Sequence, residues 1–117
     1  DQPRSRGLGD VYKRQVYTRG DKMITRFKAE EHEAQAFDDN ENKIGYCQFE
    51  EKIDSTWAIT HTVVNKDHQG EGVAEAVLDE VCDKARESYV KILPICSYAV
   101  KKFDEQPEKY GDIDARA

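Results

Sequence analysis

TWAITHTVVNKDHQGEGVAEA, residues 56–76, is the stretch that decides the fold of this chain. Its first part, Thr56–Val64, is rich in β-branched and aromatic side chains, which favours a strand. A cluster of turn-forming residues follows, with glycine at positions 70 and 72, and a helical pattern begins directly after it. The sequence therefore predicts a strand, a glycine turn and a helix in immediate succession.

The start of such a helix is a potential anion site. Its first backbone N–H groups have no partner within the helix, and the positive end of the helix dipole lies at the same point, so a phosphate is the expected ligand. Glycine leaves room for the ligand and tolerates positive φ. The same pattern also fits an ordinary loop, so both interpretations stay open. Glu75 stands where a Rossmann fingerprint needs a small residue, and the Gly-Lys-Ser/Thr of a P-loop is absent.

The composition argues against several classes of protein. The chain has 18 basic and 24 acidic residues and a formal net charge of −6, which suits a cationic partner better than nucleic acid. No stretch approaches the ~20 apolar residues of a membrane span. Cys47, Cys82 and Cys96 form no Cys-x-x-Cys pair, so we expect neither a disulfide framework nor a metal site. Free thiols and the lack of a signal-peptide pattern lead us to expect a soluble, cytoplasmic protein.

Residues 1–22 are expected to stand apart from the fold, because they are poor in apolar residues and show no periodicity. Residues 10–15, DVYKRQ, can be written as the codons GAT GTG TAT AAG AGA CAG, which match the end sequence of a transposon-based sequencing adapter. We therefore expect residues 1–22 to be a non-native or disordered leader and Met23 to begin the natural protein. Residues 23–113 would form the domain and residues 114–117 a short tail.

The rest of the chain is patterned as a meander followed by helices. A four-residue turn at 39–42 separates two strand-like runs, which predicts a hairpin. After the glycine turn, apolar residues at spacings of three and four predict an amphipathic helix in which Cys82 is a small buried hydrophobe. A short apolar strand and a second helix stopped by Pro107 complete the pattern. The expected order is β-β-β-α-β-α, at residues 32–38, 43–51, 56–64, 72–88, 90–95 and 98–105.

This order predicts an α+β fold with a mostly antiparallel sheet and one parallel pair. A parallel strand that is reached through a helix normally lies beside the strand that precedes the helix. Ligands bind beyond the carboxyl ends of such strands, so Cys96 is expected to face the glycine turn.

The segment Gln69–Ala74 resembles the Gln/Arg-x-x-Gly-x-Gly/Ala signature of the GCN5-related N-acetyltransferase (GNAT) family. Further similarity, in His61-Thr62-x-Val64 and Lys91–Tyr98, is to the short single-domain branch of that family and extends over most of residues 24–112. The resemblance implies a GNAT-like fold with the parallel pair at the cofactor site, and acetyl-coenzyme A (acetyl-CoA) as co-substrate. It implies cofactor contacts from Val63, Val64, Gln69, Gly70, Glu71, Gly72, Val73 and Ala74.

The same resemblance raises a question about catalysis. After the last core strand, the family pattern is similar to Asn-x-x-Ala-x-x-x-Tyr, with the tyrosine as the usual proton source. In this sequence Cys96 stands in the asparagine position and Phe103 in the tyrosine position, so the usual phenol is missing. Cys96, His61 and Tyr98 are therefore the candidate catalytic residues.

Each candidate also has a structural interpretation. Cys96 precedes a helix N-terminus, which favours a thiolate, and it could be a nucleophile, a proton relay or a buried structural cysteine. Strict alternation places His61 on one strand face with Trp57, Ile59 and Val63, so it could be a general base or a core residue. Tyr98 could donate a proton or simply pack.

Three functions are compatible with the sequence. The first is an acetyl-CoA-dependent N-acetyltransferase acting on a small-molecule or protein amine. The second is a module that binds CoA or acyl-CoA without turnover, which the missing tyrosine keeps open. The third is an interaction module on the same fold, in which the glycine loop is only a turn.

Overall fold

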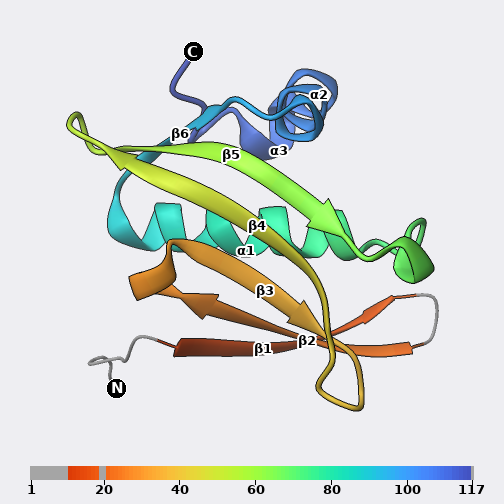
Figure 1. The fold of residues 1–117 in the computed structure, drawn as a ribbon. Coiled ribbons are helices and arrows are strands. Elements are labelled where there is room, and N and C mark those ends of the chain that lie inside the picture. Colours follow the sequence, from red (N-terminus) through yellow and green to blue (C-terminus); the bar gives the residue numbers. More distant parts are fainter. Residues whose placement is uncertain (1–10, 19–20, 117) are drawn as a thin grey trace.

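A six-stranded sheet with its strands in chain order forms the body of the protein, and helix α1 lies along one of its faces (Figure 1). The computed structural model describes residues 11–18 and 21–116 of the 117-residue chain. The strands are β1 (Val11–Thr18), β2 (Asp21–Lys28), β3 (Glu33–Phe37), β4 (Lys43–Lys52), β5 (Thr56–Val64) and β6 (Lys91–Pro94). The helices are α1 (Val73–Ser88), α2 (Ser97–Glu105) and α3 (Pro107–Tyr110), with 3-10 turns at Ala29–Glu31 and Lys66–His68.

Strand pairing confirms the predicted fold class. Neighbouring strands from β1 to β5 are antiparallel, and β6 is parallel to β5 after the crossover through α1. The predicted hairpin is the β3–β4 pair, and its turn is closed by Asp38. The Asp38 carboxylate accepts hydrogen bonds from the backbone N–H groups of Asn40 and Asn42, each at 2.9 Å. Within the described residues, no helix is long and apolar enough to cross a membrane.

The chain before Met23 differs from the expectation. Residues 11–18 form the edge strand β1, and β2 begins at Asp21, so this part of the expected leader does not stand apart from the sheet. The two strands pair antiparallel along their full length. Ladder pairing uses backbone groups, so an edge strand can form without the apolar alternation that the prediction relied on. Residues 1–10, the first part of the expected leader, lie outside the described residues, and the origin of the leader stays a prediction.

The core lies between α1 and the sheet. The helix contacts strands β2 to β6, and its inward residues Val77, Leu78, Val81 and Ala85 have no exposed surface. Cys82 is buried among them, as predicted, and burial raises the pKa of its thiol well above the ordinary value. On the sheet, Phe27, Phe49 and Trp57 stack ring against ring. These contacts fix the position of α1, and therefore of its N-terminus, relative to β5.

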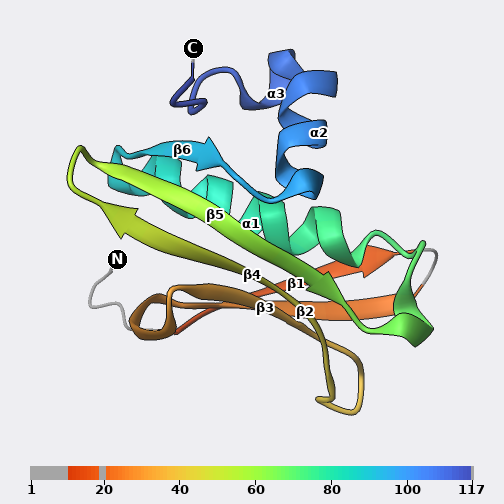
Figure 2. The ribbon, with the colours of Figure 1, turned by 45° about the horizontal axis from the view of Figure 1, so that its top comes forward.

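Helices α2 and α3 lie on the β6 side of the molecule and pack on each other (Figure 2). Phe103 of α2 is buried and stacks on Tyr110 of α3, with ring centroids 4.6 Å apart. The expected tail also contacts the domain, because Asp114 forms a β-bridge with Ile92 and Arg116 lies 3.0 Å from the Asp104 carboxylate. Residue 117 lies outside the described residues.

Candidate active site

A β-bulge at Thr60 decides which side chains of β5 face the helix. Gln48 of β4 pairs with His61 and Phe49 pairs with Ile59, so Thr60 is an extra residue in β5. Because side chains alternate along a strand, one extra residue reverses the facing of everything after it. Thr62 and Val64 therefore point to the α1 side, and His61 and Val63 point to the opposite face.

The expected packing of His61 among large apolar groups is consequently wrong. Its side chain is exposed, and its Nδ1 lies 3.1 Å from Oγ1 of Thr60. His61 is on the open face of the sheet, not in the core with Trp57 and Ile59. Its possible role as a general base stays a prediction, and an acceptor would have to approach that face to meet it.

The parallel strands β5 and β6 separate beyond Ile59. Their pairing ends at Ile59 and Pro94, where the Ile59 carbonyl accepts from the N–H groups of both Ile95 and Cys96, at 3.0 and 3.1 Å. On its other edge β5 continues along β4, and Asn65 donates to the Ile44 carbonyl at 2.7 Å. Backbone alternation then directs the N–H and C=O groups of Thr62 and Val64 away from β4. These groups form an open strand edge in front of α1.

The glycine turn presents the N-terminus of α1 to this open edge. Gly70 and Gly72 have φ values of +81° and +89°, a conformation that favours glycine. Gly72 is the N-cap of α1 and has no side chain to bond the first N–H groups of the helix. The preceding loop is held by His68, whose Nδ1 lies 2.9 Å from a carboxylate oxygen of Glu71. The turn therefore leaves helix N–H donors available for an anion.

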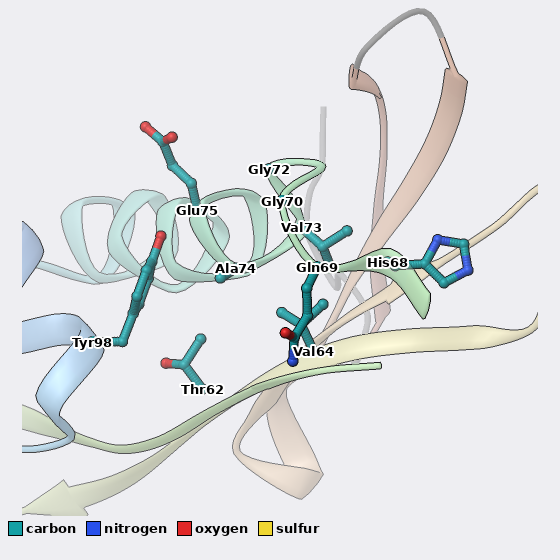
Figure 3. A pocket seen from close by; sticks show the side chains of 10 residues that line it. All are labelled: Thr62, Val64, His68, Gln69, Gly70, Gly72, Val73, Ala74, Glu75 and Tyr98. Atoms are coloured by element: carbon teal, nitrogen blue, oxygen red, sulfur yellow. The ribbon is translucent and has the colours of Figure 1, made fainter. Parts of the chain in front are cut away.

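A cavity of about 380 Å³ lies between these elements (Figure 3). It joins the end of β5, the glycine turn, the first turn of α1 and the start of α2. Seven of the predicted site residues line it: Val64, Gln69, Gly70, Gly72, Val73, Ala74 and Tyr98. Three further lining residues, Thr62, His68 and Glu75, were not predicted. Thr62 lies on the same side of β5 as Val64, because the bulge at Thr60 turns both residues toward α1.

Four predicted site residues are absent from the lining of this cavity. Glu71 is turned toward His68, and Val63 lines a separate hollow of about 230 Å³ on β4 and β5. His61 faces away, as described above. Cys96 is the N-cap of α2 and lies directly behind Thr62, with its Sγ 3.5 Å from Oγ1 of Thr62. The thiol thus touches the cavity wall.

Tyr98 is the phenol that reaches the cavity. It lies in the first turn of α2, and Figure 3 shows its ring beside the first turn of α1, near Ala74 and Thr62. Burial, together with the carboxylates of Glu75 and Asp79, raises the pKa of Tyr98 to about 12. Its hydroxyl is therefore protonated at neutral pH and can donate a hydrogen bond.

Glu75 would place a negative charge beside an anion site, but two lysines compensate it. Lys109 Nζ lies 2.9 Å from carboxylate oxygens of both Glu75 and Asp79, and Lys102 Nζ lies 3.7 Å from Glu75. These contacts also join α1 to α2 and α3. Phe103, in the position expected for a tyrosine, is buried against Tyr110 and is not part of the cavity wall.

A strand edge that opens beside a glycine turn and a helix N-terminus defines a class of site: it suits an extended ligand that carries phosphate at one end. The model of the family GCN5-related N-acetyl-transferase matches residues 32–113, and the chain belongs to this family. The resemblance to the GNAT family that the sequence indicated is confirmed, and the chain is an acetyltransferase by family. No curated protein matches the sequence significantly.

Solved structures share the fold. A GCN5-like protein from Staphylococcus aureus, determined by NMR, has a TM-score of 0.60 at 22% identity, over 92% of this chain and 90% of that one. The N-acetylglutamate synthase from Neisseria gonorrhoeae, complexed with coenzyme A and N-acetyl-glutamate, has a TM-score of 0.56 at 20% identity, over 68% of this chain and 20% of that one. A Bacillus anthracis protein crystallised with acetyl coenzyme A has a TM-score of 0.54 at 14% identity, over 83% and 69%.

Proposed function

We propose that this chain transfers an acetyl group from acetyl-CoA to an amine. The observation that carries the proposal is the cavity in which the open edge of β5 meets the N-terminus of α1. Two structures with the same fold contain coenzyme A or acetyl coenzyme A, which supports this choice of donor. The three free thiols favour a reducing compartment, so we place the reaction in the cytoplasm.

The cofactor would lie across the cavity from the glycine turn to Tyr98. Its pyrophosphate would accept hydrogen bonds from the N–H groups that follow Gly72, where the helix dipole favours an anion. The amides of the pantetheine arm would pair with the free N–H and C=O groups of Thr62 and Val64, as an added strand does. The thioester would then lie near Tyr98 and the Cys96 thiol.

Amide formation from a thioester needs a neutral amine, a donor for the carbonyl oxygen and a proton for the departing thiolate. The cofactor would occupy the α1 side of the sheet, so the amine would reach the thioester through the gap where β5 and β6 separate, coming from the face on which His61 could take up its proton. In direct transfer the amine attacks the carbonyl carbon, the C–S bond breaks, and the departing CoA sulfur receives the proton that the amine nitrogen loses. Tyr98 would donate a hydrogen bond at the thioester.

A covalent route uses Cys96. The Cys96 thiolate would attack the carbonyl carbon and displace CoA as a thiolate, which leaves an acetyl group on sulfur. The amine would then attack that second thioester, forming the amide and releasing the Cys96 thiolate, while the proton lost by the amine nitrogen passes to the CoA thiolate. Both routes have the same products, and a search for acetylated Cys96 distinguishes them.

The acceptor is either a small-molecule amine or a protein amine. The net charge of −6 favours an amine that arrives as a cation. Such an amine must lose its proton before it attacks, and the exposed imidazole of His61 would be the base that accepts it.

Binding without turnover is the second candidate function. It is favoured by one observation: Phe103, in the position where the family pattern has its acid, is buried against Tyr110. In that case the cavity would hold CoA or acyl-CoA while Cys96 and His61 served only structural purposes.

Two measurements test the proposal. Calorimetry with CoA asks whether the cavity binds the cofactor, and a screen of amines with acetyl-CoA asks whether free CoA and acetylated product appear together. Binding with transfer supports the enzyme. Binding without transfer over a broad screen of small and peptide amines would favour the binding module, and no binding would leave an interaction module.

A further inference from the structure

Thr62 contacts two cysteines from different elements. Its Oγ1 lies 3.5 Å from Sγ of Cys96, at the N-cap of α2, and 3.6 Å from Sγ of Cys47, in the middle of β4. Thr62 is also part of the cavity wall. One hydroxyl on β5 therefore links a buried thiol, a half-buried thiol and the space where the thioester would lie.

Cys47 is the buried, neutral partner of the Thr62 hydroxyl. Cys47 has no exposed surface, and burial raises the pKa of its thiol to about 12. Cys47 is therefore neutral over the whole physiological range. Its sulfur accepts a hydrogen bond from the Thr62 hydroxyl.

The hydroxyl can serve Cys96 in either protonation state, because it has one proton and two lone pairs. When Cys96 is a thiol, its S–H donates to Oγ1 while the Thr62 proton points to Cys47. When Cys96 is a thiolate, rotation about the Cβ–Oγ1 bond turns the Thr62 proton to Cys96. Cys47 then loses a weak hydrogen bond, whereas the thiolate gains a charge-assisted one.

The backbone holds the hydroxyl in this position. Thr62 pairs with Cys47 across β4 and β5, and the bulge at Thr60 turns it to the cysteine side of the sheet. A threonine side chain on a strand has few χ1 alternatives, so little conformational freedom is lost when it serves as donor. The arrangement is therefore present before any ligand binds.

We propose that Thr62 is the residue that positions the Cys96 sulfur for acetyl transfer and stabilises its thiolate. The role rests on the proposed function, because it matters only if Cys96 takes part in the reaction. Other ionisable groups near this end of the sheet are Glu33 on β3, Glu75 and Asp79 on α1, Tyr98 on α2 and Lys109 on α3. The carboxylates of Glu33, Glu75 and Asp79 are each bonded to lysine, so Thr62 is the neutral donor in direct contact with Cys96.

The test measures Cys96 itself and needs neither cofactor nor acceptor. The unliganded protein is treated with iodoacetamide, whose carbon is attacked by the thiolate as iodide leaves, and the rate at Cys96 is read by peptide mass spectrometry. Cys47 and Cys82 are buried and serve as slow internal references. The compared proteins are the wild type, Thr62→Val, Thr62→Ser and Thr60→Val. Thr60 is the matched control, because it lies in the same strand and its hydroxyl bonds to the Gln48 carbonyl.

We expect Thr62→Val to slow alkylation of Cys96 about tenfold, the factor for losing one moderate hydrogen bond to a charged group. Thr62→Ser should stay within about twofold of the wild type, and so should Thr60→Val. A wild-type rate in Thr62→Val would overturn the proposal, and so would an equal fall in Thr62→Ser. If Thr62→Val fails to fold, Thr62→Ala removes the same hydroxyl and is read in the same way. Absence of acetyl transfer would count against the proposed function, but it would not change the effect of Thr62 on the alkylation rate of Cys96.

Discussion

The hydroxyl of Tyr110 donates a 2.7 Å hydrogen bond to the carboxylate of Asp79, and this contact joins the last helix to the middle of α1. Burial and the Asp79 carboxylate together raise the pKa of Tyr110 far above its ordinary value, so the phenol remains protonated. Asp79 also bonds Lys109, and its neighbour one turn earlier, Glu75, lines the cavity. The position of Tyr98 against α1 thus depends on contacts outside the cavity.

Tyr110→Phe should reduce the free energy of unfolding by about 1.5–3 kcal/mol, the usual range for a hydrogen bond to a charged group. The phenylalanine keeps the ring that stacks on Phe103, so the loss is that of the hydroxyl. Urea unfolding monitored by circular dichroism measures the change. The matched control is Tyr89→Phe, since Tyr89 is 92% exposed. Equal stability of Tyr110→Phe and wild type would mean that the contact is not needed.

Gly72→Val should abolish CoA binding while the protein stays folded. At φ +89° a β-branched residue is strained, and relief of that strain moves the N–H groups of the first helical turn. Calorimetry with CoA measures the affinity. Asp39→Val adds the same side chain in the exposed turn between β3 and β4 and should bind normally. An unchanged affinity in Gly72→Val would remove the proposed phosphate site.

Cys96→Ala should lower turnover at least ~10²-fold, the low end for losing a general acid or base, with CoA affinity nearly unchanged. The thiol lies behind Thr62, close to the expected thioester but outside the residues that would grip the cofactor. Initial rates with acetyl-CoA and the best amine from the screen measure the effect. Cys82→Ala controls for loss of a thiol elsewhere.

The covalent route also predicts that Cys96 of the wild-type protein becomes acetylated. Mass spectrometry after incubation with acetyl-CoA alone should find an acetyl group on Cys96. If no adduct forms, only the relay role remains. Full activity of Cys96→Ala would return the residue to a structural role.

A shortened chain that begins at Met23 should bind CoA as the full chain does. Every residue that lines the cavity comes from β5 or later, and β1 contacts the sheet through β2 at the far edge. Calorimetry measures the affinity for CoA, and urea unfolding compares the free energy of unfolding of the shortened chain with that of the full chain. Equal stability would show that residues 1–22 contribute nothing to the fold. A loss of more than ~1 kcal/mol, a large share for a small domain, would show that β1 contributes to the fold.

Glu33 should make stability depend on pH in the acid range. Burial alone would raise the pKa of this carboxyl, but hydrogen bonds from Lys43, Gln35 and Gln48 outweigh burial and hold the pKa below its ordinary value of 4.5. A lowered folded-state pKa gives stability that is complete above the unfolded-state value and is lost as the pH falls through the folded-state value.

The measurement compares wild type with Glu33→Gln by urea unfolding from pH 6 to pH 3. The stability advantage of the wild type should be largest at pH 6 and shrink below about pH 4.5. Glu50→Gln, in an exposed ion pair with Lys52, should change little over the same range. If the free energies of unfolding of wild type and Glu33→Gln differ by the same amount at every pH, the Glu33 carboxylate charge does not have the proposed stabilising role.

Local sequence accounts for most of the phosphate end of the site. The glycines at 70 and 72, together with the helical spacing that follows, were sufficient to predict the turn and α1, and six of the eight expected cofactor residues line the cavity. Glu71 was the exception in the loop because a contact with His68, three residues away, turns it aside.

The catalytic end was harder to predict because its geometry is set by pairing between distant segments. The bulge at Thr60 exists in the register of β5 against β4, and nothing in Thr56–Val64 alone identifies it. Without it, His61 is assigned to the core and Thr62 to the wrong face. Likewise β1 forms through its ladder with β2, not through an apolar pattern of its own.

The extra residue at Thr60 decides which face of the sheet each later side chain of β5 occupies, and the proposed chemistry depends on this assignment. An imidazole and a hydroxyl occupy consecutive positions, so the sheet can offer only one of them to the cysteines and must offer the other to the opposite side. If Thr60 were instead paired with Gln48 in a regular ladder, every later residue would shift by one position, placing His61 against the sulfurs and Thr62 in solvent. Deleting Thr60 would remove the bulge but leave His61 opposite Gln48, and so preserve the assignment. Related sequences that lack a residue at this position should therefore keep the histidine on the open face and the hydroxyl beside the cysteines.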